Sequence, residues 1–109
     1  MIPTEIYQGQ PASTETTMYT VPAGQRLIGT EIILCNTTSI IRTTTLHWRR
    51  GGVAAGVTNR ILSGREVGAN SSIIISLGST MLGAGGIISG LASVSGTITV
   101  TISGILEAI

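Results

Sequence analysis

The chain has 109 residues, of which 42% are hydrophobic, 10% are charged and 3% are aromatic. This length supports one domain with one hydrophobic core. Its charges are six arginines and five glutamates, which give a net charge of +1. Because nucleic-acid binding proteins normally carry a dense basic stripe, this balance argues against a nucleic-acid partner.

The residue types available for a core favour strands. Phenylalanine is absent, so isoleucine, leucine and valine must fill the core, with Trp48 as the one large anchor. Serine and threonine are abundant, and β-branched residues fit the pleated surface of a sheet. The composition therefore predicts an all-β protein.

The first 15 residues are polar and show no sustained periodicity, and they contain Pro3, Gly9 and Pro11. We expect an extended N-terminal arm at 1–15, ahead of a β-sandwich domain at 16–109. In an assembling protein such an arm often lies on a neighbouring subunit.

Extended or alternating segments follow one another at a spacing of about ten residues. Turn residues such as Ser63 to Glu66 separate them, and Ser95-Gly96 predicts a hairpin into the last strand. This pattern predicts a single antiparallel β-sandwich or flattened barrel, jelly-roll or immunoglobulin-like, with about seven to eight strands. The expected strands are 17–21, 26–35, 43–49, 57–62, 71–77, 87–94 and 97–103.

Alternation within these strands predicts which side chains face the core. In the last strand, Ile98, Val100 and Ile102 share the inner face. In 43–49, Trp48 is expected inward and His47 outward, as an exposed surface residue. The strand at 26–35 is apolar on both faces, which suits a strand that a partner covers on its outer side.

The sequence offers little equipment for catalysis. Cys35 is the single cysteine and His47 the single histidine, so no internal disulfide and no ligand spacing for a metal are available. There is no Gly-x-Ser-x-Gly elbow for a nucleophile, and the glycines at 83–86 do not complete a dinucleotide-binding motif. We therefore expect a protein that is not an enzyme and has no catalytic residue, metal site or cofactor.

The region from Val67 to Leu106 carries no charged residue, and the window 73–92 has the length of a membrane-spanning helix. Turn residues at 78–80 and 83–86 interrupt this window, and period-2 alternation follows it. A sheet is the better interpretation, and a small membrane protein stays as an alternative.

Several turn and strand motifs carry a family likeness between about Thr17 and Ile105. These motifs are YTVPAG at 19–24, LCNTT at 34–38, TTTLHWRRGG at 43–52, TNRIL at 58–62 and TITVTISGI at 97–105. With them the chain resembles a group of small virion proteins of tailed bacteriophages, which are β-sandwiches of about a hundred residues with a "VPAG…CNT" signature. The resemblance assigns no functional residue.

The resemblance, together with sparse charge and apolar loops, implies a capsid decoration or cement subunit on the capsid exterior. Its partners would be copies of itself, with a trimer favoured, and other virion proteins such as the major capsid protein, but no nucleic acid and no membrane. A tail, fibre or baseplate component, which could bind a host glycan, is the alternative. The candidate interface residues are Ile2, Ile6, Tyr7, Ile40, Ile41, Arg49, Arg50, Val53, Met81 and Leu82.

Overall fold

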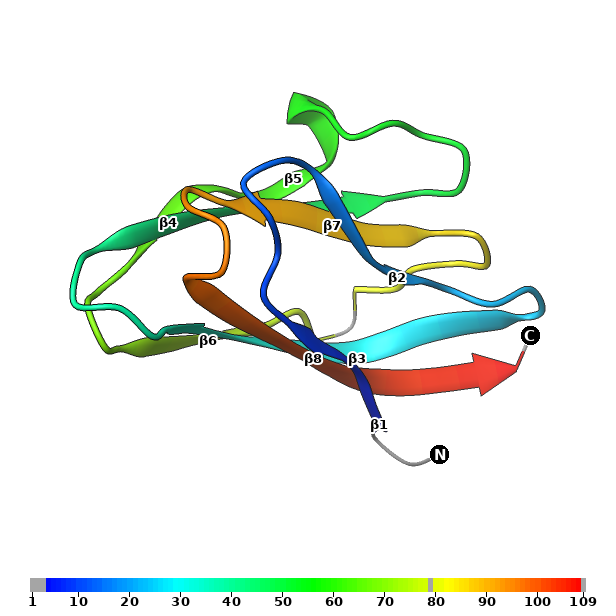
Figure 1. The fold of residues 1–109 in the computed structure, drawn as a ribbon. Helices are drawn as coiled ribbons and strands as arrows, with labels where there is room; N and C mark the ends of the chain where they lie inside the picture. The colour runs from blue at the N-terminus through cyan, green and yellow to red at the C-terminus, as the bar shows by residue number, and fades with distance from the viewer. Residues whose placement is uncertain (1–3, 79, 109) are drawn as a thin grey trace.

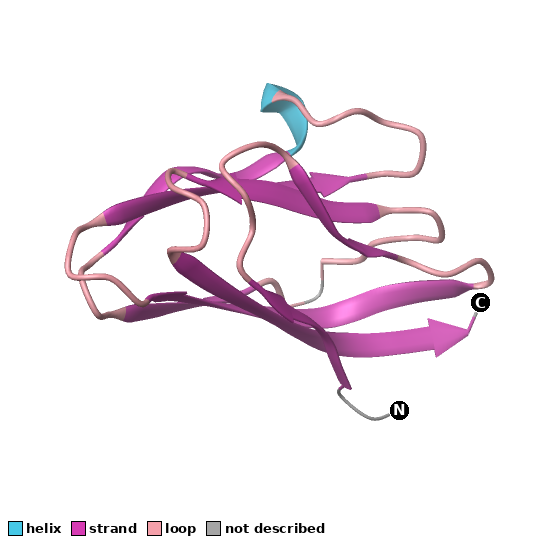
Figure 2. Cartoon of the chain, in the orientation of Figure 1, coloured by secondary structure: helices cyan, strands magenta, loops and turns pink. Residues whose placement is uncertain are grey.

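The computed structural model describes residues 4–78 and 80–108, which form a sandwich of two β-sheets (Figure 1). A short 3₁₀ helix, η1, lies in the loop before β5, and strands dominate the rest (Figure 2). The elements are β1 (Thr4–Gly9), β2 (Thr16–Thr20), β3 (Gln25–Asn36), β4 (Arg42–Arg49), η1 (Val57–Asn59), β5 (Arg60–Val67), β6 (Ser72–Ser76), β7 (Ile87–Ala92) and β8 (Ile98–Ala108).

The strand order is that of a jelly roll. The first sheet has the order β1-β8-β3-β6 and the second sheet the order β2-β7-β4-β5. The antiparallel pairs β1–β8, β2–β7, β3–β6 and β4–β5 are nested, as though the whole chain were folded double and then wrapped into two layers. The expected antiparallel β-sandwich is confirmed, and this order selects the jelly roll among its forms.

The core lies between the sheets and consists of aliphatic side chains. Ile98, Val100 and Ile102 on β8 are fully buried, as their alternation predicts. Opposite them in the register lie Asn36, Leu34 and Ile32 on β3. Further buried side chains come from both sheets: Met18, Val21, Leu27, Leu46, Val67, Leu82, Ile88 and Ala92.

A bulge explains part of the apolar pattern on the two faces of β3, while Ile33 stays apolar and exposed on the outer face. The register with β8 shifts between Ile28 and Glu31, and Gly29 adopts a left-handed φ of 61° that favours glycine. Because of the inserted residue, the side chains that face the core stand at odd-numbered positions before the bulge and at even-numbered positions after it. Leu27 and Ile32 are therefore both buried, although strict alternation would put them on opposite faces.

The structure corrects several expectations about elements. Residues 4–9 do not form an arm outside the sandwich, because they pair with β8 as an edge strand. The Ser95-Gly96 segment is not a hairpin, since β7 and β8 lie in different sheets. The turn expected at 63–66 is part of β5, where Gly64 has a φ of 61° and its N–H donates to Thr45 Oγ1 over 3.0 Å. Residues 57–59 form η1 instead of the start of a strand.

Gly90, in the middle of β7, tests how closely β7 and its neighbour β4 approach each other within the second sheet. It is buried opposite Leu46, and a Cβ built there would collide with the Thr45 carbonyl oxygen and lie 2.7 Å from Leu46 Cδ2. We expect Gly90→Ala to lower the free energy of unfolding by about 1–3 kcal/mol, measured by chemical denaturation. Gly83→Ala is the matched control, because nothing lies within 4 Å of its Cβ position. Equal stability of the two variants would contradict the close approach.

Candidate functional site

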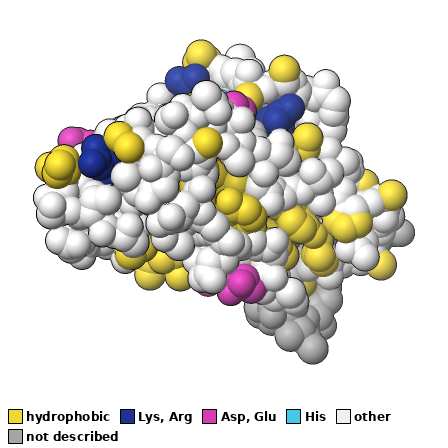
Figure 3. Space-filling view, in the orientation of Figure 1, with side chains coloured by type: hydrophobic (Ala, Val, Ile, Leu, Met, Phe, Trp, Pro, Cys, Tyr) yellow, Lys and Arg dark blue, Asp and Glu magenta, His cyan; other side chains and the backbone are white. Residues whose placement is uncertain are grey.

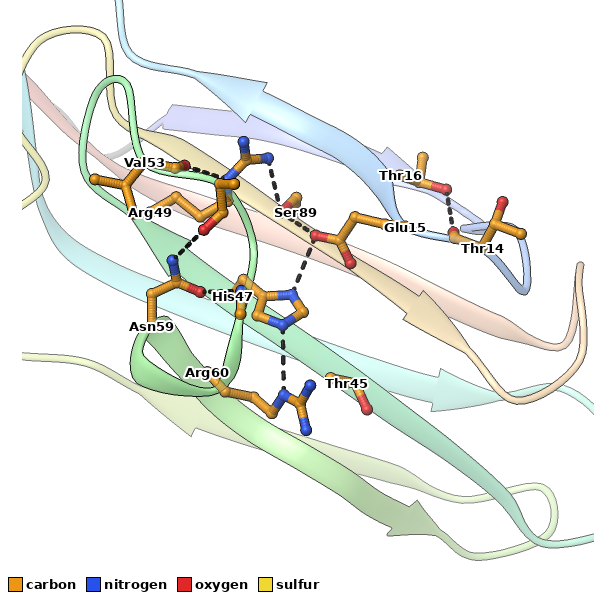
Figure 4. A network of polar contacts seen from close by, with 12 residues as sticks. Thr14, Glu15, Thr16, Thr45, His47, Arg49, Val53, Asn59, Arg60 and Ser89 are labelled. Carbon is orange, nitrogen blue, oxygen red and sulfur yellow. Dashed lines mark hydrogen bonds and ion pairs between the residues drawn. The ribbon is translucent and has the colours of Figure 1, made fainter.

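A cluster of polar side chains lies on the outer face of the second sheet (Figure 4). His47 and Arg49 point outward from β4, and Ser89 lies beside His47 in the register of β7. Two flanking segments complete this polar cluster: Glu15 precedes β2, and Arg60 begins β5 opposite His47.

Glu15 contacts two other residues of the polar cluster. Its Oε2 accepts a hydrogen bond from Ser89 Oγ and lies 3.1 Å from His47 Nδ1. Arg60 Nε donates to His47 Nε2 over 3.4 Å, and Arg49 Nη1 lies 3.4 Å from Ser89 Oγ as a donor. The Glu15 carboxylate thus accepts from the Ser89 hydroxyl and lies beside the His47 imidazole, and each of these two groups also contacts a guanidinium group.

The cluster does not have the geometry of a catalytic triad. Ser89 and His47 are 0% and 4% exposed, so a substrate cannot reach the hydroxyl. The Ser89 hydroxyl donates to Glu15, whereas a triad serine donates to the imidazole. Arg60 also occupies the His47 nitrogen that would act as the base. This arrangement fastens the segment before β2 and the start of β5 to the second sheet.

The expectation of an exposed His47 is wrong. Its side chain does point away from the core, but Glu15 and Arg60 cover it. Trp48, expected as the inward anchor of the core, packs against the core while remaining half-buried.

A cavity of about 410 Å³ lies beside Trp48. The loop that forms part of its wall is tied down by Asn59, whose Oδ1 accepts from the Gly56 N–H over 3.0 Å and whose Nδ2 donates to Ala54 O over 2.8 Å. The lining residues of the cavity are Trp48, Arg50, Val53, Thr58, Asn59, Thr80 and Met81. The cavity therefore combines the aromatic surface of Trp48 with a guanidinium group and threonine hydroxyls.

The structure separates the candidate interface residues into groups. Ile40, Ile41, Arg50, Val53 and Met81 are exposed and available for contacts. Leu82 is 1% exposed and pairs with Leu27, so its assignment to an interface is wrong.

The remaining candidates lie elsewhere. Ile6 and Tyr7 are half-buried against the core as part of β1, and Arg49 belongs to the polar cluster. Ile2 lies outside the described residues. Among the surface positions that sequence reasoning missed, Val57 is 78% exposed and Ile74 is 68% exposed.

Figure 3 shows one largely uncharged face, on which some hydrophobic side chains stand singly and others gather in a band from the middle toward the right. Within residues 4–78 and 80–108, no group of three or more histidine, cysteine or acidic side chains is placed to hold a metal ion. Cys35 is free and half-buried. Burial raises the pKa of the Tyr19 phenol above its ordinary value. In the same part of the chain, no helix has the length and apolar character needed to span a membrane.

Glu15 is the residue whose loss should disturb the polar cluster most. Glu15→Ala removes the acceptor of the Ser89 hydroxyl and the carboxylate that lies 3.1 Å from His47 Nδ1, and both His47 and Ser89 are buried. We expect the free energy of unfolding at neutral pH to fall by about 1–3 kcal/mol in denaturant titrations. Glu5→Ala is the matched control, because it removes the same charge from an exposed position of β1. If both variants lose the same stability, the cluster does not anchor its loops.

No family model and no curated protein matches the sequence.

Proposed function

We propose that this protein is a structural component of a bacteriophage virion, a decoration subunit that binds the outer surface of the capsid. The observation that carries the proposal is the apolar character of its exposed loops. Ile40 and Ile41 follow β3, Val53 and Val57 precede β5, and Met81 follows β6. Interface cores are depleted in charged residues, and these loops carry exposed apolar side chains.

The fold supports this proposal by analogy. Jelly rolls occur in viral capsid proteins as well as in lectins and cupins, so the fold by itself does not select one of these functions. The sequence resemblance to small virion proteins favours the capsid class. A decoration subunit does not require an accessible catalytic group.

The physical mechanism would be the addition of contacts between neighbouring capsid subunits. A small protein of this size makes a limited interface with any single neighbour. When it bridges several subunits, the second and later contacts form at a high effective concentration. Many weak apolar contacts can then stabilise a shell.

A tail or fibre component that binds a host glycan is the second candidate, because the cavity beside Trp48 favours it. Sugar-binding sites use an aromatic face against the apolar side of the ring and polar groups against its hydroxyls. Trp48, Arg50 and Thr58 line one cavity and offer these three kinds of contact.

The decoration function is tested on purified particles of the phage that encodes the chain. Cryo-microscopy is expected to show its density on the capsid exterior, and density only at the tail would contradict the proposal. Val57→Glu should weaken binding to capsid shells about tenfold or more, because a charge replaces a contacting aliphatic group. Ser95→Glu, which adds the same charge to an exposed turn, is the control for the binding measurement.

The glycan-binding candidate is tested with Trp48, the single tryptophan, as a fluorescent reporter. Titration with a panel of neutral and acidic sugars should give a saturable change in emission for at least one of them. Calorimetry with that sugar should show a Kd about tenfold higher for Arg50→Ala if the sugar is acidic. No saturable change with any sugar of the panel would contradict this candidate.

A further inference from the structure

Strand β6 lies at the edge of the first sheet, where β3 is its neighbour on one side. Its hydrogen bonds show which backbone groups face the other side. The Asn36 N–H donates to Ser71 O and the Leu77 N–H donates to Thr30 O, both over 2.9 Å. These contacts place residues 71 and 77 in hydrogen-bonded pairs with β3.

Hydrogen-bonded pairs alternate along an antiparallel ladder, and the β3–β6 register is continuous. Residues 73 and 75 therefore also bond to β3. The N–H and C=O groups of Ser72, Ile74 and Ser76 point away from the sheet, toward an edge at which no strand of the described chain pairs.

The other three edge strands carry features that discourage pairing with another chain. β1 has a register shift and the exposed charge of Glu5, and β2 has a register shift. β5 has two register shifts and carries Arg60, Arg65 and Glu66. Bulges and charges are the usual devices that protect sheet edges.

β6 has none of these devices. Its sequence is Ser-Ile-Ile-Ile-Ser, its pairing with β3 has no shift, and the chain carries no charge from Val67 to Leu106. The segment also reads the same in both directions about Ile74. It is therefore complementary to a second copy of itself in the antiparallel orientation.

We propose that β6 pairs with β6 of a second copy of this chain about a two-fold axis at Ile74, which joins two first sheets into one continuous sheet. In this register Ile74 lies opposite Ile74 of the second copy, and Ser72 lies opposite its Ser76. All three are positions whose backbone groups face the open edge. About six backbone hydrogen bonds form, because each of three such pairs exchanges two.

The side chains around the edge also fit a second copy. Ile74 lies beside Ile33 on the outer face, where they are 68% and 39% exposed. The two-fold axis extends this pair into a row of four isoleucines. Ile73 and Ile75 face the core but remain half-buried, so a paired strand would also cover them.

A paired strand of five residues does not by itself bury the roughly 1,000 Å² that specific interfaces bury in total. The loop that carries the exposed Ile40 and Ile41 can add apolar area. It lies beside the start of β6, because the Asn70 N–H donates to Thr38 O over 2.9 Å. Ile40, Ile41 and the residues of β6 are all uncharged, so these residues cause no repulsion between like charges across the two-fold axis.

This inference goes beyond the proposed virion function and does not depend on it. Antiparallel pairing of identical edges is isologous and closes at two copies. It therefore predicts a dimer, whereas a trimer was favoured from the sequence.

Sedimentation equilibrium and native mass spectrometry over a concentration series test the pairing. The unmodified chain is expected to form a dimer. Ile74→Lys or Ile74→Glu alone should raise the dimer Kd about tenfold or more, because like charges then lie directly opposite each other. An equimolar mixture of the two variants should recover dimers that contain one chain of each, which the mass identifies.

Val94→Lys, which adds a charge at an exposed position outside β6, is the control and should leave the dimer Kd unchanged. The Ile74 side chain is exposed, so equal unfolding midpoints will show that its variants stay folded. A monomer at all concentrations, a dimer or trimer insensitive to Ile74→Lys, or a mixture without mixed dimers would overturn the proposal. The capsid test uses Val57, away from β6, so either proposal can fail while the other stands.

Discussion

The pairing of β3 with β8 is the contact on which the rest of the structure depends. These are the two longest strands, and they lie side by side in the middle of the first sheet. Their inward side chains form much of the first sheet's contribution to the core. β1 pairs with the free edge of β8, and β6 pairs with the free edge of β3. Because the two strands are distant in sequence, this pairing must overcome a large loss of chain entropy before it contributes stability. The nested pairs of the second sheet extend the same arrangement toward the β4–β5 hairpin.

Local pattern was enough to predict much of this fold. The inward set Ile98, Val100 and Ile102 is confirmed because period-2 alternation is a property of the strand itself. The bulge at Gly29 was hidden, since a single glycine in a strand can mark a bulge or only a weak position. Turn chemistry at Ser95-Gly96 indicates a reversal of direction, but it does not specify whether the next strand joins the same sheet. Long-range packing determines which sheet the next strand joins.

The polar cluster could not be predicted for the same reason. Glu15, His47 and Ser89 come from three distant segments, and no spacing in the sequence links them. The register of β4 against β7 brings His47 beside Ser89, and the path of the chain before β2 then brings Glu15 over both. A solitary outward histidine is ordinarily exposed, and only the covering segments make this one buried. Sequence patterns report the direction of a side chain but not what lies above it.

The distribution of charge over the two sheets links stability to assembly. In the second sheet, arginine and glutamate side chains are used in the polar cluster and on β5. In the first sheet, Arg26 and Glu107 form an ion pair between the start of β3 and the end of β8. Among the four edge strands of the described chain, β6 is the one with neither a charge nor a register shift. An unprotected edge is a liability in a protein that stays alone, because any extended chain can add to it. It is an advantage in a protein that assembles, because the same backbone groups then pair in one defined register.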